Sequence, residues 1–450
     1  MDDRTHLLEY GNVSKLLFSF AMPAIIATAA SSLYNLIDRM FIGQGVGSLA
    51  LAGLGLTLPV MNVATGFGTL VGAGAGALVA IRMGEKKKDS ATKILCNALL
   101  LNLIISIVFS IATLVFLDEI LYLFGADQET LPYARDFLQI ILAGNVITHL
   151  LFGLNSIMRS SGYPVKAMLS VLITVVCNLI LAPLFIFGFR WGIRGAATAT
   201  VISQFIGMCW VMAHFLNPRS FIHFERKSMR LDVRLALEIF SIGLSPFFIH
   251  TCSSLVNIFM NWQLKEYGGN MAIAAFGIVS VILSLLITII LGMTHGMQPI
   301  VGFNYGAGKS SRVLQTYWLT VRYATLVCAI GFVALMFVPQ YIARAFTDSP
   351  EVVKLTARAM RICGAMMLLI GFQVVTSNFF QSIGKAKISV FLSLSRQIIF
   401  LLPFILLLPN WGGLDGVWGA MPAADLCSTG ITALMLWLFL KKWKKEGALN

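Results

Sequence analysis

About twelve long apolar stretches, separated by short polar or Gly/Pro-marked segments, run the length of this 450-residue chain. A helix needs roughly 20 apolar residues to cross a ~30 Å hydrocarbon core. Because lipid offers the backbone no hydrogen-bond partners, stretches of this length predict membrane-spanning helices. We therefore expect an all-α polytopic membrane protein with twelve transmembrane helices. The expected spans are residues 15–38, 49–81, 93–117, 133–157, 166–188, 196–215, 236–262, 271–301, 314–338, 356–380, 388–408 and 417–440.

The composition agrees with this class of protein. Hydrophobic side chains make up 58% of the chain and charged ones 12%, whereas a soluble globular domain carries roughly 25% charged residues. The first apolar run is long for a signal peptide, and neither a basic leader nor a small-residue cleavage site accompanies it. We expect this run to be retained as the first span.

The formal net charge is +13, but the basic residues gather in alternate loops. That pattern sets the orientation of polytopic membrane proteins and places these loops in the cytoplasm. The loop residues are Arg82, Lys86, Lys87, Lys88, Lys93, Arg219, Arg226, Lys227, Arg230, Arg234, Lys385, Lys387, Lys441, Lys442, Lys444 and Lys445. Arg190, Arg194 and Arg344 fall on the opposite side. We expect both termini in the cytoplasm and no nucleic-acid partner.

The chain repeats itself at an offset near 222 residues. This offset pairs "LALAGLG" at 49–55 with "MAIAAFG" at 271–277, and Gly162 with Gly384. Each repeat holds six spans, so the second copy enters the membrane in the same direction as the first, as in transporters that alternate access. We predict a six-helix lobe at 1–216, a cytoplasmic linker at 217–234 and a second six-helix lobe at 235–450.

The first span carries a polar stripe that ends in a carboxylate. Ser31, Tyr34, Asn35 and Asp38 are three or four residues apart and share one helix face. The matching stretch of the second repeat, "SSLVNIFMN" at 253–261, is polar but uncharged. An acidic side chain inside a membrane is costly and points to function. Asp38 is therefore the first candidate for a site.

Several motifs together resemble the multidrug and toxic compound extrusion (MATE) transporters, whose larger group includes bacterial lipid and polysaccharide flippases. The resemblance covers essentially the whole chain. It rests on "LYNLIDRMFIG", "LALAGLGLTLP", "NLILAPLFIFGF", "GIRGAATATVISQ", "GMQPIVGFNYGAGKSSR", "SRQIIFLLPFILLLP" and "GVWGAMPAAD". It implies a V-shaped arrangement of two pseudo-symmetric six-helix lobes in the cytoplasmic membrane of a bacterium.

The resemblance also implies a coupling site in the first lobe. The family positions fall on Asp38, Asn178, Ala182 and Thr200, and Ala182 stands where the family has a second aspartate. A hard sodium ion prefers several oxygen ligands, whereas a proton needs one carboxyl group. We therefore favour proton coupling, with sodium at Asp38 as the alternative. Deep acidic residues of the NorM-like branch are lacking in the second lobe, so the chain looks closer to the DinF-like branch.

Flexible and aromatic side chains around a broad cavity would let different substrates bind. The candidate lining residues, chosen by helix face and family position, are Tyr34, Asn35, Met61, Asn155 and Gln204. Arg396 and Asp425 are intramembrane charges of the second lobe, either a mutual structural pair or part of the coupling.

These features predict a secondary active antiporter that exports cationic amphipathic compounds by alternating access. No phosphate-binding GxxxxGK[ST] segment occurs, and we expect no cofactor, membrane lipid as surroundings and a monomer. A flippase for a lipid-linked precursor is the nearest alternative, with Arg396 as its main deep basic group. A membrane-embedded enzyme is a more distant one, because His149, His250 and His295 are scattered singly.

Overall fold

The computed structural model describes residues 3–445, and within that range the chain forms helices and no strand. The first half contains α1 (Asp3–Tyr10), α2 (Val13–Gly45), α3 (Ser48–Gly84), α4 (Lys88–Val115), α5 (Leu117–Leu123), α6 (Leu131–Ala143), α7 (Asn145–Ser160), α8 (Pro164–Pro183), the π-helical η1 (Leu184–Gly188) and α9 (Gly192–Leu216). The second half contains η2 (Arg226–Ser228), α10 (Val233–Gly306), α11 (Ser310–Phe337), α12 (Pro339–Arg344), α13 (Pro350–Cys363), α14 (Met367–Ser382), α15 (Ala386–Leu394), the π-helical η3 (Ser395–Leu401), α16 (Leu402–Leu407) and α17 (Pro409–Lys445).

The described helices account for twelve passes across a membrane. Nine helical segments are long and apolar enough to span, where α8 with η1, and α15 with η3 and α16, each count as one segment. Two bent pairs, α6 with α7 and α13 with α14, raise the number to eleven. The twelfth comes from α10, because its 74 residues contain a break at Gly269, where φ is 64°. A positive φ is accessible to glycine at little cost, which suits the chain reversal there. The expected all-α, twelve-helix fold is confirmed.

Two expected spans, 133–157 and 356–380, are not straight. The axis bends by 55° between α6 and α7, and by 52° between α13 and α14. Gly144 ends α6, and a methyl group on it would lie 2.6 Å from the Val201 side chain of α9. Gly364 caps α13 at the equivalent break. Glycine at these points lets a neighbouring helix pack into the bend.

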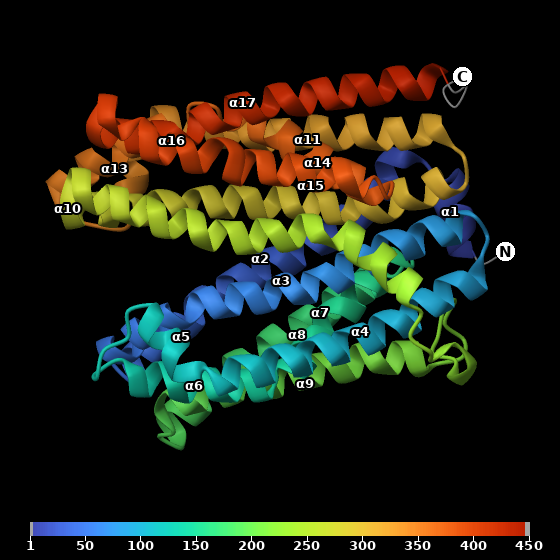
Figure 1. The fold of residues 1–450 in the computed structure, drawn as a ribbon, viewed down its shortest axis with the longest axis horizontal. Helices are drawn as coiled ribbons and strands as arrows, with labels where there is room; N and C mark the ends of the chain where they lie inside the picture. The colour runs from blue at the N-terminus through green and yellow to red at the C-terminus, as the bar shows by residue number, and fades with distance from the viewer. Residues whose placement is uncertain (1–2, 446–450) are drawn as a thin grey trace.

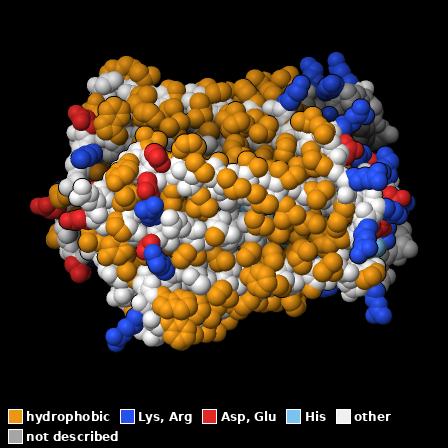
Figure 2. Space-filling view, turned by 60° about the horizontal axis from the view of Figure 1, so that its bottom comes forward, with side chains coloured by type: hydrophobic (Ala, Val, Ile, Leu, Met, Phe, Trp, Pro, Cys, Tyr) orange, Lys and Arg blue, Asp and Glu red, His pale blue; other side chains and the backbone are white. Residues whose placement is uncertain are grey.

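The helices form two lobes, one from each half of the chain (Figure 1). The lobes meet at the end that carries both termini and diverge toward the end that carries α5, α6 and α13. Lys and Arg side chains crowd the first of these ends, and a broad apolar belt lies between the two ends (Figure 2). We call the end with the termini the basic end and the other the opposite end. The V shape expected from the sequence is confirmed.

Glycines bring the lobes together at the basic end. A methyl group on Gly84 of α3 would lie 1.9 Å from the carbonyl oxygen of Phe303, and one on Gly306 of α10 would lie 2.1 Å from the carbonyl oxygen of Ile81. The offset of 222 residues converts one contact into the other. The two repeats therefore pack here about their shared axis, with the backbones in direct contact.

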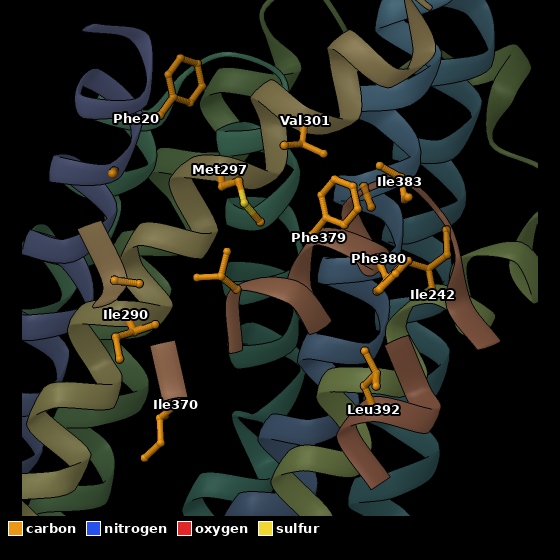
Figure 3. Packing of buried hydrophobic residues seen from close by; sticks show 14 of the residues in the cluster. Phe20, Ile242, Ile290, Met297, Val301, Ile370, Phe379, Phe380, Ile383 and Leu392 are labelled. Carbon is orange, nitrogen blue, oxygen red and sulfur yellow. The ribbon is translucent and has the colours of Figure 1, made fainter. Parts of the chain in front are cut away.

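A buried apolar cluster crosses from one lobe to the other in the same region. Phe20 of α2 belongs to it together with Met297 and Val301 of α10 and Phe379 of α14 (Figure 3). In lipid, such contacts stabilise through van der Waals packing, since lipid tails are as apolar as the side chains.

The lobes are apart toward the opposite end. Residues 70–84 of α3 are nearly all buried, whereas most of residues 48–69 are partly or fully exposed. A methyl group added to Gly277 of α10 or to Gly55 of α3 would meet no side chain or neighbouring helix within 4 Å. The same helix thus contributes to a tight seam at one end and to an open surface at the other.

Candidate coupling and substrate site

Thr200 of α9 joins three helices of the first lobe. Its hydroxyl oxygen accepts a hydrogen bond from the Asn178 side-chain amide of α8 at 3.1 Å and lies 3.2 Å from the Tyr34 hydroxyl of α2. The Thr200 hydroxyl itself donates to the Ala196 carbonyl at 3.1 Å. Two of the three predicted coupling residues, with one of the predicted cavity residues, therefore form a single hydrogen-bonded group.

Asp38 lies one helical turn from Tyr34 on α2, within electrostatic range of it. Its Oδ1 atom is buried, and no group among the described side chains hydrogen bonds to it. Arg39 is exposed and follows Asp38 along the helix, so the two side chains diverge. An unpaired carboxylate oxygen beside hydroxyl and amide groups is chemically suited to a proton or a small cation.

A site built from several acidic or sulfur ligands does not occur around Asp38. Within residues 6–445, no three His, Cys, Asp or Glu side chains gather closely enough to hold a metal ion. Ala182, the position that the family resemblance aligns with an aspartate, is fully buried in an apolar cluster with Ile42, Leu54 and Phe185. The small alanine side chain fits this apolar packing. The hydroxyl groups of Tyr34 and Thr200, which lie beside Asp38, are neutral.

The other predicted cavity residues occupy different surroundings. Asn35 is exposed, and Met61 is partly exposed. Gln204 of α9 accepts a hydrogen bond from Thr148 of α7. Asn155 is buried, and its amide donates to the Ala167 carbonyl of α8 at 2.8 Å, so this side chain ties α7 to α8.

Arg396 and Asp425 form a salt bridge inside the second lobe. The Arg396 Nε atom lies 2.7 Å from Asp425 Oδ1, and the Asp425 side chain is only 2% exposed. Arg396 is carried by the π-helical η3, and Asp425 by α17. A second polar contact lies near the pair, where Gln373 of α14 donates to Ser428 at 2.8 Å.

One group of basic residues could not be predicted from the sequence pattern of single helices alone. His250 and His295, which look isolated along the chain, both lie in α10, and His295 is within electrostatic range of His250 and of Arg159 on α7. Comparing each residue with its counterpart 222 positions away would have found this cluster, since Arg159 corresponds to the neutral Gln381.

Comparisons with known proteins agree with this architecture. A family model described as MatE matches residues 23–184 and 246–407, one segment in each repeat. Multidrug export protein MepA of Staphylococcus aureus (strain MSSA476) is 26% identical, with 98% of this chain and 96% of the relative aligned. The protein of the same name from Staphylococcus haemolyticus (strain JCSC1435) is also 26% identical, over 95% of this chain and 94% of the relative.

Solved structures share the fold over nearly the whole chain. The MATE multidrug transporter DinF-BH, solved as a ligand complex, is 36% identical, with a TM-score of 0.88 over 94% of this chain and 95% of that one. A MATE protein in the bent conformation is 24% identical and has a TM-score of 0.93, with both chains fully covered. The expected likeness to the DinF-like branch is confirmed. The chain is a multi-pass membrane transporter rather than an enzyme, and it belongs to the MatE family.

Proposed function

We propose that this transporter exports cationic amphipathic compounds in exchange for protons, by alternating access between its two lobes. The unpaired carboxylate of Asp38, in the part of α2 where the lobes have separated, is the observation that carries this proposal. The names of the MepA relatives and of DinF-BH, which describe multidrug export and multidrug transport, support it.

The exchange would follow from competition for one negative group. Contact with water favours the ionised form of a carboxylic acid, and burial favours the protonated form. A cationic compound and a proton both neutralise Asp38, so binding of one would promote release of the other. The ion gradient would then drive export without nucleotide hydrolysis.

The distribution of charge supports an orientation. The basic end would face the cytoplasm, because Lys and Arg are retained there, and the carrier would lie in the inner membrane of a bacterium with both termini inside. The tight seam at the basic end and the separation at the opposite end would then correspond to an outward-open state.

Protons are favoured over sodium as the coupling ion. Asp38 is the acidic group of this site, and Ala182 is packed among apolar side chains. Sodium would have to bind mainly through neutral oxygens such as those of Thr200 and Tyr34. A lipid flippase has less support from Arg396, since the Asp425 carboxylate already neutralises that guanidinium.

Efflux from proteoliposomes tests this function. The purified protein and Asp38→Asn would be compared for efflux of a fluorescent organic cation under a pH gradient and, separately, under a sodium gradient. Glu119→Gln, which removes an exposed carboxylate at the opposite end, is the control. We expect the pH gradient to drive efflux in the wild type and the control only. Equal efflux by Asp38→Asn would overturn the role of Asp38, and efflux driven only by sodium would overturn proton coupling.

A further inference from the structure

Arg159 is an arginine within the first lobe that has no acidic partner. Its Nε atom is buried and makes no hydrogen bond in the described part of the chain, and its Nη2 atom donates a long hydrogen bond to the Ser156 hydroxyl at 3.4 Å. No carboxylate of residues 6–445 forms a salt bridge with it. A charge inside a membrane protein is costly unless it is paired, so an unpaired one is a candidate for a functional role.

One histidine of the other lobe, His295, approaches Arg159, and a second, His250, lies near His295. His295 of α10 is in electrostatic range of both Arg159 and His250. Nearby, the Gln298 side chain of α10 donates to the Ala73 carbonyl of α3 at 3.3 Å, so the two lobes are in contact at this level. Arg159, His250 and His295 are each partly exposed. We call these three residues the interlobe basic cluster.

The internal repeat has no counterpart of this cluster. At an offset of 222 residues, Arg159 corresponds to Gln381, His295 to Ala73 and His250 to Thr28. The equivalent places of the other repeat are thus built without any charge. At the same offset, Asp38 corresponds to the uncharged Met260. Asp38 and the interlobe basic cluster are therefore both places where one repeat carries ionisable side chains and the other does not.

Neither intramembrane aspartate, Asp38 or Asp425, forms a salt bridge with the cluster in the described part of the chain. Asp425 is already paired with Arg396, and Asp38 lies on α2, beside Tyr34. A guanidinium binds the two oxygens of a carboxylate or phosphate in a fixed geometry, and imidazoles add further N–H donors. The chemistry of the cluster is therefore complementary to an anionic group.

We propose that the interlobe basic cluster binds the carboxylate or phosphate of a transported amphiphile. The cluster lies where the two lobes meet, a surface that alternating access would open and close, so a ligand held there would be moved rather than stored. This inference rests on the proposed export function and extends it to zwitterionic and anionic substrates, whose negative groups Asp38 would not attract.

Matched dyes test the proposal. One is a cationic fluorescent ester, and the other is the same dye with a free carboxylate; both would be titrated into the purified full-length protein and followed by fluorescence polarisation. Arg159→Gln installs the residue of the other repeat, and Arg322→Gln removes an exposed arginine of α11 as a control. Because Arg159→Gln removes the charged hydrogen bonds from the guanidinium to the carboxylate, we expect this variant to bind the carboxylate dye about 10-fold or more weakly. Its affinity for the ester should change less than about two-fold.

Further measurements test whether each variant is folded, and whether the bound anion is a carboxylate of a small molecule or the phosphate of a lipid. Ester binding reports a folded protein, and Arg159→Lys should recover part of the carboxylate-dye affinity. A short-chain fluorescent phosphatidic acid, compared with its uncharged diacylglycerol, tests a lipid phosphate in the same way. Selective weakening of either anionic probe supports the cluster as an anion site. The proposal would be overturned if Arg159→Gln weakened binding of each anionic probe and of its matched counterpart equally. It would also be overturned if this variant weakened binding of neither anionic probe. If the wild-type protein did not export the cationic ester from proteoliposomes, the result would instead contradict the proposed function.

Discussion

At the scale of single residues, the Thr200 hydroxyl has all its hydrogen-bonding capacity occupied. It can donate once and accept twice, and it donates to Ala196 while the Asn178 amide and the Tyr34 hydroxyl share its oxygen. Three helices of the first lobe are therefore held in register by one oxygen atom. Asp38 lies beside this group without being bonded to it, which leaves its carboxylate available.

Replacing Thr200 with valine keeps the shape of the side chain and removes that oxygen. We expect Thr200→Val to lower the free energy of unfolding by about 1–3 kcal/mol, because the buried Asn178 amide loses its partner, and to weaken binding of a cationic dye. The measurement is thermal unfolding together with dye titration. Thr198→Val, at a partly exposed position of the same helix, is the control. Identical behaviour of the two variants would show that the Thr200 hydroxyl has no special role.

The sequence indicated which residues of this site are unusual but not how they are bonded. Asp38 could be recognised because a carboxylate is rare inside a membrane span. Tyr34 contacts Thr200, and Asn155 of α7 hydrogen bonds to α8. Both interactions depend on how each helix is rotated about its axis. Helical spacing defines a face without saying which neighbour that face contacts. The roles of these residues in coupling and in the cavity stay predictions.

At the scale of helices, the seam between α3 and α10 depends on backbone contact. A methyl group on Gly74 would lie 2.0 Å from the Ile239 carbonyl oxygen, and one on Gly243 would lie 1.8 Å from the Leu70 carbonyl oxygen. Both contacts join the two lobes toward the basic end. Any side chain at these positions would force the helices apart.

We therefore expect Gly74→Ala to open the basic end. Spin labels at Lys87 and Lys385, in loops of different lobes at that end, would report a longer or broader distance distribution in this variant than in the parent protein. Gly277→Ala adds the same methyl group where nothing lies within 4 Å and should leave the distances unchanged. An unchanged distribution in Gly74→Ala would contradict a seam held by glycine.

The short helix α1 attaches the start of the chain to the second lobe. Lys309 Nζ lies 3.1 Å from the Glu9 carboxylate, and Arg312 donates to the Gly11 carbonyl at 2.8 Å. The hydrogen bond from Lys309 holds the pKa of Glu9 below its ordinary value of 4.5. The contact thus stabilises the fold above pH 4.5, and its contribution is lost as the pH falls through the lower pKa of the folded state.

Removing this contact should have a pH-dependent effect. We expect Glu9→Gln to lower the free energy of unfolding by about 1 kcal/mol at neutral pH, with the difference from the wild type shrinking as the pH falls below 4.5. Thermal unfolding at several pH values measures it. Glu129→Gln, which alters an exposed carboxylate, is the control. A difference that stays constant with pH would contradict a contribution from the ionised carboxylate.

The helical elements were largely predictable, and the exceptions have a common cause. Length and apolarity predicted every span, because the hydrocarbon thickness sets a minimum helix length. The bends at Gly144 and Gly364 and the π-helical turns of η1 and η3 were not predicted. These features accommodate neighbouring helices, and the apolar pattern of a span does not record its neighbours. The division at residues 216 and 235 stays a prediction, although α9 ends at Leu216.

At the scale of the whole molecule, two repeats of one design carry different charges. Contacts at the basic end, such as Gly84 with Phe303 and Gly306 with Ile81, obey the repeat. Asp38 and Arg159 depart from it, since their counterparts are Met260 and Gln381. A symmetric frame allows the two lobes to move against each other. We expect the unshared charges of Asp38 and Arg159 to bind the ligands that this movement carries.

Proton release on substrate binding tests most directly whether substrate and proton compete for Asp38. A cationic dye would be added to purified protein in weakly buffered solution, and the pH change would be recorded for the wild type and for Asp38→Asn across neutral and mildly acidic pH. We predict that dye binding releases protons from the wild type and none from Asp38→Asn. Dye binding without proton release in the wild type, or with the same release in both proteins, would contradict the account.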